Sequence, residues 1–222
     1  MNTPETTLVL VCKRPAPGHG KQRLAATLGQ EAAWRIARLL LHCALEDLLS
    51  WDGPVVIAPD TPADVNWAAG LVSRDVIVIP QASGNLGQRI NKLDTQLRCR
   101  GHQQLLWIGS DCPALTAPHL NWAAEALQQQ DIALLPAADG GVVLMANRQP
   151  WPALAKLPWS QSSFAEQLQS CCQRQQLTVT CGDMLFDIDS ENELQRWLEM
   201  HRTDNRLARQ LLRNHVQKHQ AR

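Results

Sequence analysis

Asp111 is well placed for chemistry because it follows an apolar run, residues 105–108, that has the character of a buried strand. In open α/β sheets, ligands bind beyond the carboxyl ends of the strands, so a carboxylate there can meet a ligand. Gly109 permits close approach of the backbone, and Pro113 prevents the strand from continuing. The alternative is a turn or helix cap, although Thr116 is the better cap for the next helix. The position favours an anchor for a divalent cation.

A basic loop after the first predicted strand is the natural complement of this carboxylate. The segment 13–23 carries four positive charges and is followed by no acidic residue before Glu31. Two glycines expose backbone N–H groups, and a helix that begins near Lys21 adds its dipole, which together suit phosphate oxygens. The alternative is a solvated basic loop. The residues that we predict to contact phosphate are Lys13, Arg14, Gly18, Gly20, Lys21 and Arg23.

Further carboxylates lie on two later segments. Asp139 precedes Gly140 and Gly141 on a tight turn, which either brings backbone close to a ligand or simply joins two strands of a hairpin. Asp187 and Asp189 alternate, so they share one face of a short extended segment. They complete a metal site or merely precede a capped helix. The residues alone leave both alternatives open.

The segment 83–89 follows the third predicted strand. Its Gly84 and Arg89 line the same crevice, or the segment is an ordinary βα loop with a surface arginine. The seven histidines have no metal-binding spacing, and none lies near a serine or cysteine in a nucleophile motif. Hydrolysis by a catalytic triad is therefore unsupported.

The elements that must position these residues alternate between short apolar strands and helices, which predicts a mainly parallel sheet covered on both faces. We expect strands at 7–12, 55–58, 76–79, 105–108 and 132–135, with helices at 31–49, 91–100 and 118–130. The fold class is α/β, in three layers (α/β/α).

The pattern changes after residue 135. Residues 142–146 follow too closely for a crossover helix, so we expect an antiparallel strand there. A helix over 160–174, a strand over 177–181 and a capped helix over 190–200 complete a single domain, residues 1–202. We expect the basic tail, residues 203–222, to form a surface helix that frays.

Composition excludes several partners. Lys and Arg together number 21, as do Asp and Glu, so the charge cancels and the overall footprint of a nucleic-acid-binding protein is absent. No apolar run is long enough for a membrane span, and seven cysteines without zinc spacing fit reduced thiols. We expect a cytoplasmic protein, and exposed tryptophans would be compatible with a homodimer.

Four ordered blocks carry a resemblance to a known family: residues 15–24, 84–89, 108–115 and 136–141. With these blocks, the chain from 8 to 198 resembles the bacterial DUF2064 family, glycosyltransferase-A-like proteins also called selenodomain-associated transferases. The family is similar to nucleotide-diphospho-sugar transferases and, distantly, to the molybdopterin and phospholactate nucleotidyltransferases.

The resemblance implies a nucleotide or nucleotide-sugar donor and an unknown acceptor. The donor phosphates would lie near Lys21 and Arg23, Mg²⁺ or Mn²⁺ near Asp111, and Asp139 would orient or deprotonate an acceptor hydroxyl. Glycosyl transfer and nucleotidyl transfer use the same kind of phosphate-binding site, so the resemblance leaves both reactions open. A metal-dependent glycosyltransferase is the leading hypothesis.

Five positions depart from the family's pattern. Gln22 stands in place of a threonine, Asn85 and Gln88 in place of acidic residues, Val142 in place of an aromatic residue and Ala146 in place of a glycine. These departures motivate a hypothesis of another class: a nucleotide-binding protein that retains the fold and lacks catalysis.

Overall fold

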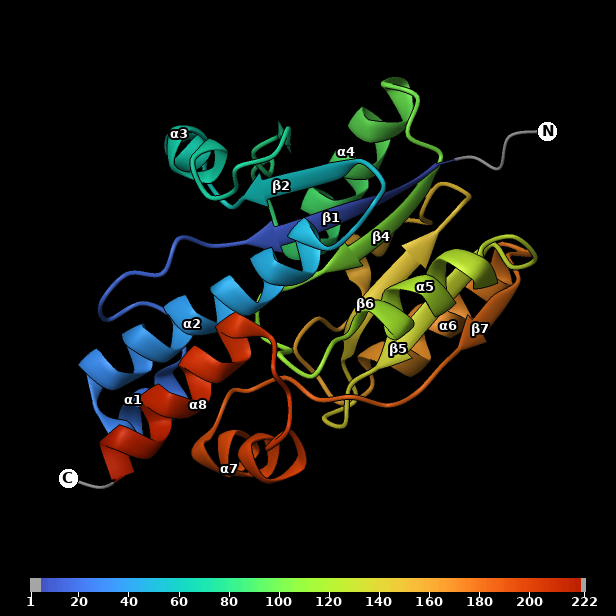
Figure 1. Cartoon of the computed structure of the whole chain (residues 1–222). Coiled ribbons are helices and arrows are strands. Elements are labelled where there is room, and N and C mark those ends of the chain that lie inside the picture. The colour runs from blue at the N-terminus through green and yellow to red at the C-terminus, as the bar shows by residue number, and fades with distance from the viewer. Residues whose placement is uncertain (1–4, 221–222) are drawn as a thin grey trace.

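A computed structural model describes residues 5–220, so residues 1–4 and residues 221–222 of the predicted tail lie outside the described part. A seven-stranded sheet with the order β3-β2-β1-β4-β6-β5-β7 crosses the molecule (Figure 1). β6 is antiparallel to β4 and β5, and the other neighbouring strands are parallel. The strands are β1 (Thr6–Cys12), β2 (Val55–Pro59), β3 (Ile77–Val78), β4 (Gln104–Ile108), β5 (Ile132–Pro136), β6 (Val142–Asn147) and β7 (Val179–Cys181).

Helices cover both faces of the sheet, which confirms the three-layer α/β fold. Leu8 and Leu10 of β1 pack toward one face, and Val9 between them packs toward the other, as the period of two in a strand requires. The helices on the first face are α2 (Gln30–Leu49), α3 (Val65–Ala69) and α5 (Ala117–Ala126). Those on the second face are α4 (Leu86–Cys99) and α6 (Phe164–Arg174), with the 3₁₀ turn η2 (Leu154–Lys156). Another 3₁₀ turn, η1 (Pro62–Asp64), precedes α3.

A further apolar cluster gathers α1 (Gln22–Leu28), α7 (Glu191–Met200) and α8 (Leu207–Gln220) against α2 at one end of the molecule (Figure 1). We expected the basic tail to form a surface helix that frays. This prediction is wrong for one face of α8, which is buried. Ala208, Leu212 and Val216 recur every four residues and are buried in the cluster. Contacts with α2, rather than local propensity, therefore hold this helix.

Most predicted elements are present with shifted ends. α4 begins at Leu86, before the expected residue 91, because Asn85 and Gln88 form a capping box. The strand after the Asp139 turn pairs antiparallel with β5, as expected. All seven cysteines are free. None of the eight tryptophans is exposed. The homodimer was predicted from exposed tryptophans, so that prediction has no support from them.

No helix in residues 5–220 has the length and apolar character required to cross a membrane.

Candidate functional site

Several predicted site segments meet where parallel strands end. β1 leads into the loop 13–21, β4 leads to Asp111, and β5 leads to the turn of Asp139. The segment 182–190, after β7, lies between the last two. Leu185 N–H donates to the Pro136 carbonyl at 2.9 Å, and Ile188 N–H donates to the Asp111 carbonyl at 2.8 Å. Main-chain hydrogen bonds therefore bring Asp187 and Asp189 beside the strand-end carboxylates.

Lys21 is the cation at the centre of this arrangement. Its Nζ lies 3.0 Å from Asp111 Oδ1 and 2.7 Å from Asp189 Oδ1, and it also donates to the Ile188 carbonyl at 2.7 Å. Only 7% of the side chain is exposed. Burial lowers the pKa of Lys21, but Asp111 and Asp189 outweigh burial, so the net pKa is raised. The ammonium is consequently a fixed charge.

Asp187 carries a large electrostatic perturbation. Burial raises its pKa to about 7, with further increases from Asp111, Asp189 and Asp139, while Lys21 acts in the opposite direction. These aspartates thus repel one another, and Lys21 only partly compensates them. Titratable groups perturbed in this way are concentrated in functional sites.

A cavity of about 160 Å³, which we call the aspartate cavity, opens beside this cluster. Arg196 covers the Phe186 ring, with its guanidinium carbon 4.3 Å from the ring centroid. Glu193 Oε2 accepts hydrogen bonds from the N–H groups of Asp189 and Ser190. The cavity is lined by Ala138, Asp139, Phe186, Asp187, Asp189, Glu193 and Arg196.

The turn at Asp139 joins β5 to β6 and also reaches this cavity. Gly141 N–H donates to Asp139 Oδ1 at 2.9 Å. Gly140 has a φ of 87°, and a Cβ there would collide with the Ser162 carbonyl oxygen. Only glycine satisfies both conditions, so the turn fixes Asp139 at the cavity wall.

Comparison with known proteins identifies the family. The sequence profile of the family described as "Uncharacterized protein conserved in bacteria (DUF2064)" matches residues 41–161, which include Asp111 and Asp139. The chain belongs to this family. No protein with curated annotation matches the sequence.

Solved structures show that the fold of this DUF2064 protein is that of nucleotide-diphospho-sugar transferases and nucleotidyltransferases. A candidate nucleotide-diphospho-sugar transferase from Desulfovibrio desulfuricans G20 matches with a TM-score of 0.89 and 20% identity, over 99% of this chain and 96% of that one. A CMP:2-keto-3-deoxy-manno-octonic acid synthetase in complex with CTP matches with a TM-score of 0.56 and 12% identity, over 90% and 99%. Rv0371c of Mycobacterium tuberculosis H37Rv, in complex with manganese, matches with a TM-score of 0.50 and 17% identity, over 88% and 98%.

The predicted phosphate-binding residues do not all gather at Lys21. Arg14 turns toward Asp64, 3.4 Å away, and its guanidinium carbon lies 5.7 Å from the Trp67 ring centroid. Lys13 and Arg23 are exposed, and no ion pair joins either to an acidic residue in the described chain. The basic loop is therefore divided between two regions.

The predicted glycines shape loops around the site. Gly18 and Gly20 have φ values of 75° and 74°, and Gly84 has a φ of 111° just before α4. Arg89 is half-buried on α4, and within residues 5–220 no hydrogen bond or ion pair joins it to the aspartates. This segment of the DUF2064 protein forms the βα loop before α4, but Arg89 is not the surface arginine of the simpler alternative, because its Nε is buried and has no hydrogen-bond partner among the described residues. Contact of Gly84 and Arg89 with a ligand stays a prediction.

Three of the departures from the family pattern have local structural roles. Gln22 Nε2 donates to the Gly18 and Gly20 carbonyls at 3.0 and 3.3 Å, which holds the loop. Asn85 and Gln88 form the capping box of α4 through two reciprocal hydrogen bonds. These side chains therefore stabilise the loops on which they lie.

Sequence reasoning missed two charged residues of the cavity, Glu193 and Arg196. The capping box from Ser190 to Glu193 was visible in the sequence, and the structure contains it. Residues three apart lie on the same side of a helix, so the position of Glu193 could also have indicated Arg196. The available signal was the helix start, which places these residues just beyond Asp187 and Asp189.

The carboxylate oxygens at this site are the kind of ligand that a hard divalent cation prefers. Among the described residues, no three His, Cys, Asp or Glu side chains are arranged to hold a metal ion by themselves. Mg²⁺ commonly uses one or two carboxylates and takes its other ligands from phosphate and water. Asp111, at 44% exposure, and Asp189, at 46%, supply carboxylate oxygens that remain accessible for such a site.

Proposed function

We propose that this DUF2064 protein is a metal-dependent transferase that uses a nucleotide-activated donor, and that its reaction is glycosyl transfer from a nucleotide-diphospho-sugar. The observation that carries the proposal is the cluster of Asp111, Asp187 and Asp189 near Lys21, where burial, and after it the neighbouring aspartates, raise the pKa of Asp187 to about 7. A carboxylate cluster with too little positive charge favours a bound cation.

Asp111, together with Asp187 or Asp189, would hold Mg²⁺ or Mn²⁺. When bound, such a cation neutralises negative charge on a departing diphosphate or pyrophosphate. The manganese in the structure of Rv0371c supports a divalent cation in this fold. Lys21 keeps Asp111 and Asp189 in place through its two ion pairs.

The donor phosphates would lie against Arg23 and the N–H groups of the glycine-bearing loop. Lys21 would attract them through its charge, since its three N–H groups are directed to Asp111, Asp189 and the Ile188 carbonyl. Asp139 Oδ1 accepts from Gly141 N–H, so we assign Oδ2 to the acceptor hydroxyl, which it orients or deprotonates. Gly140 and Gly141 keep that carboxylate at the cavity wall.

Release of nucleoside diphosphate from nucleotide sugars in the presence of Mn²⁺ tests this proposal. We expect Asp111→Asn to lower kcat/KM by roughly 10²-fold or more, because even outer-sphere partners of a metal are worth about 10- to 100-fold. Asp183→Asn is the matched control, since Asp183 is exposed on the same segment as Asp187. Equal activity of the two variants would rule out the assigned site.

A second reaction, nucleotidyl transfer, is favoured by the fold likeness to the synthetase in complex with CTP. It releases pyrophosphate from a nucleoside triphosphate, so a pyrophosphate assay across the four common triphosphates separates it from glycosyl transfer. Calorimetric titration with nucleotides tests the remaining hypothesis, a nucleotide-binding protein without catalysis. Metal-aided nucleotide binding without turnover of any donor would favour a protein that binds nucleotide and lacks catalysis.

A further inference from the structure

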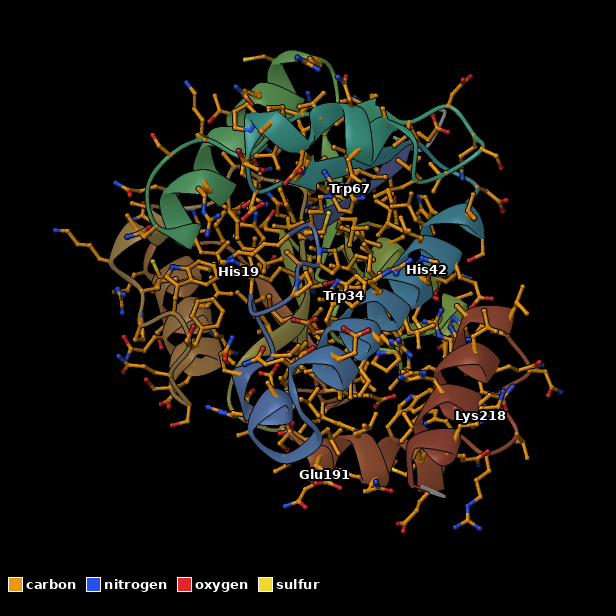
Figure 2. The ribbon with its side chains drawn as sticks, turned by 90° about the vertical axis from the view of Figure 1, so that its left-hand side faces the viewer. His19, Trp34, His42, Trp67, Glu191 and Lys218 are labelled. Atoms are coloured by element: carbon orange, nitrogen blue, oxygen red, sulfur yellow. The ribbon has the colours of Figure 1, made fainter. Side chains whose placement is uncertain are left out.

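A second hollow of the molecule, away from the aspartate cavity, is lined by cations. It consists of two adjoining parts of about 420 and 310 Å³ that share Trp34, Arg38 and His42 of α2. Figure 2 faces this surface, where Trp34, His42 and Trp67 lie across the molecule. We call it the arginine–histidine groove, and its positively charged or titratable residues are Arg14, Arg35, Arg38, His42 and His215.

Two of these arginines are held against tryptophan rings. The guanidinium carbon of Arg38 lies 5.1 Å from the Trp34 ring centroid, and that of Arg14 lies 5.7 Å from the Trp67 ring centroid. Trp34 is itself tethered, since its Nε1–H donates to the Pro15 carbonyl at 3.2 Å. A guanidinium restrained by a ring loses less freedom when it binds a ligand.

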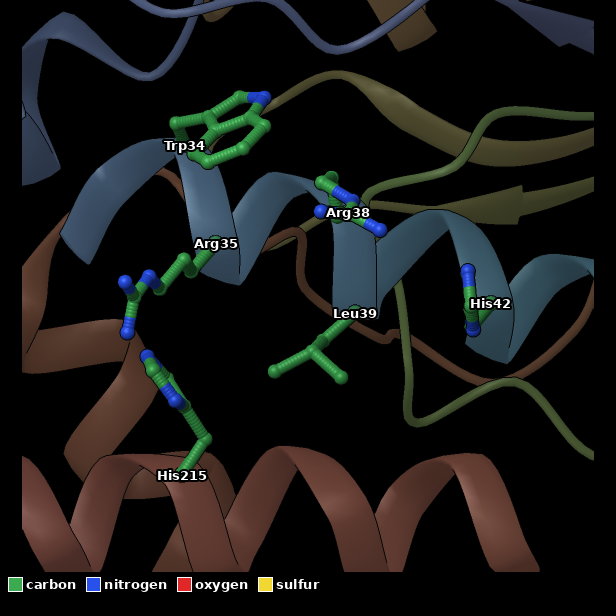
Figure 3. Close-up of a pocket in the computed structure, with 6 residues that line it drawn as sticks. All are labelled: Trp34, Arg35, Arg38, Leu39, His42 and His215. Carbon is green, nitrogen blue, oxygen red and sulfur yellow. The ribbon is translucent and has the colours of Figure 1, made fainter. Parts of the chain in front are cut away.

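No carboxylate lines either part of the groove. Arg14 and Arg35 pair with acidic residues outside the lining, Asp64 and Glu31. Arg38 is exposed and has no carboxylate within ion-pair distance in residues 5–220. Figure 3 shows the Arg35 side chain of α2 and His215 of α8 directed toward each other across the pocket. Three arginines therefore gather in the groove, and among the described residues Arg38 is the one of the three that no ion pair compensates.

We propose that the arginine–histidine groove binds a soluble phosphate-bearing anion, an organic phosphate or diphosphate, at a site separate from the aspartate cavity. Guanidinium groups match phosphate oxygens through paired hydrogen bonds, and Arg14 and Arg38 flank the same part of the groove. The groove has the size of a small-molecule site. It shares no lining residue with the aspartate cavity, so it goes beyond the proposed donor site.

Calorimetric titration with pyrophosphate in EDTA tests the groove without metal. We expect Arg38→Gln and Arg14→Gln each to weaken binding at least about tenfold, because each removes a charged hydrogen-bond donor. Arg174→Gln, which neutralises an exposed arginine on α6, is the matched control and should bind like the wild type. Absence of wild-type binding, or equal binding by all the variants, overturns the proposal.

Lys21→Gln separates this site from the donor site. We expect it to retain pyrophosphate binding in EDTA, whatever its effect on transfer. Loss of binding in Lys21→Gln with retention in Arg38→Gln would place the anion at the aspartate cavity and overturn the proposal. Sedimentation with phosphatidylcholine vesicles that contain phosphatidic acid tests a lipid source. Vesicle binding without pyrophosphate binding would also contradict the proposal.

Discussion

The aspartate cavity and the arginine–histidine groove carry opposite charges and hold them by different means. Main-chain hydrogen bonds bring the carboxylates together, and burial raises the pKa of Asp187 to about 7. In the groove, Arg35 and Arg38 project from one exposed side of α2, and tryptophan rings support two of the arginines. The cavity therefore holds a carboxylate that burial and its acidic neighbours destabilise, whereas the groove presents solvated charge. A net charge of zero for the chain conceals both.

One buried network connects the two regions. Arg209 of α8 pairs with Asp47 at 2.6 Å and with Glu46 at 2.9 Å, both on α2. It also donates to the carbonyl oxygens of Pro113 and Leu115, in the loop that follows Asp111. The same side chain thus supports the helix pair that flanks the groove and the loop of the aspartate cavity.

The largest expected effect comes from Arg209→Met. The Arg209 side chain is fully buried and the Asp47 side chain is 4% exposed, so the substitution removes one of the two arginines that compensate a buried carboxylate and leaves Arg206 at 2.9 Å. We expect a loss of about 3–5 kcal/mol in the free energy of unfolding, measured by urea denaturation. Arg174→Gln is the surface control, with a change within about 0.5 kcal/mol. A loss below about 1 kcal/mol would mean that the network does not unite the two regions.

The next effect concerns Asp187 and depends on pH. Because its folded pKa is raised from 3.8 to about 7, the folded state binds the proton more tightly than the unfolded state between these values. Stability therefore falls as pH rises through this window, and the penalty is complete above pH 7. We expect Asp187→Asn without divalent cations to be more stable than the wild type at pH 8, by about 1 kcal/mol or more, with the advantage shrinking toward pH 4.

Thermal unfolding of wild type, Asp187→Asn and Asp183→Asn from pH 4 to pH 8 measures this dependence. The Asp183 variant should follow the wild-type profile, because its side chain is exposed. If Asp187→Asn also follows the wild type, neither burial nor repulsion destabilises the Asp187 carboxylate. The contrast with the groove then disappears.

Local patterns in the sequence were sufficient for the sheet, for most helices and for the helix start at Ser190. Apolar runs of 4–8 residues and capping boxes are short-range signals, and the structure follows them. Thr116 is likewise the cap of α5, as the sequence indicated. Asp111 was selected by its position after a strand, Asp139 by its glycine-bearing turn, and Asp187 and Asp189 by their alternation. The convergence of these four aspartates depends on the parallel order of the sheet.

Contacts between distant segments were not predictable in this way. Lys21 pairs with Asp189, 168 residues later, and Arg209 pairs with Asp47, 162 residues earlier. The loop backbone has positive φ values at Gly18, Gly20 and Lys21. Lys21 lies between carboxylates, whereas Arg14 of the same loop turns toward Asp64. Residue types predicted the charges, whereas tertiary packing decided their partners.

The smallest expected effect belongs to the groove. Arg35 pairs with Glu31 at 2.8 Å, one helical turn apart, and the two side chains are 57% and 61% exposed. Such pairs contribute about 0.3–0.5 kcal/mol, and salt screens them. We therefore expect Arg35→Gln to change the free energy of unfolding by less than about 0.5 kcal/mol and the difference to vanish in about 1 M salt. A larger, salt-resistant loss would mean that the arginines of the groove stabilise the fold, so their clustering would no longer point to a ligand. If Arg35→Gln instead leaves stability unchanged and weakens pyrophosphate binding, the two regions differ in what their charges do. Charge in the groove would then affect binding, and charge in the aspartate cavity would affect folding.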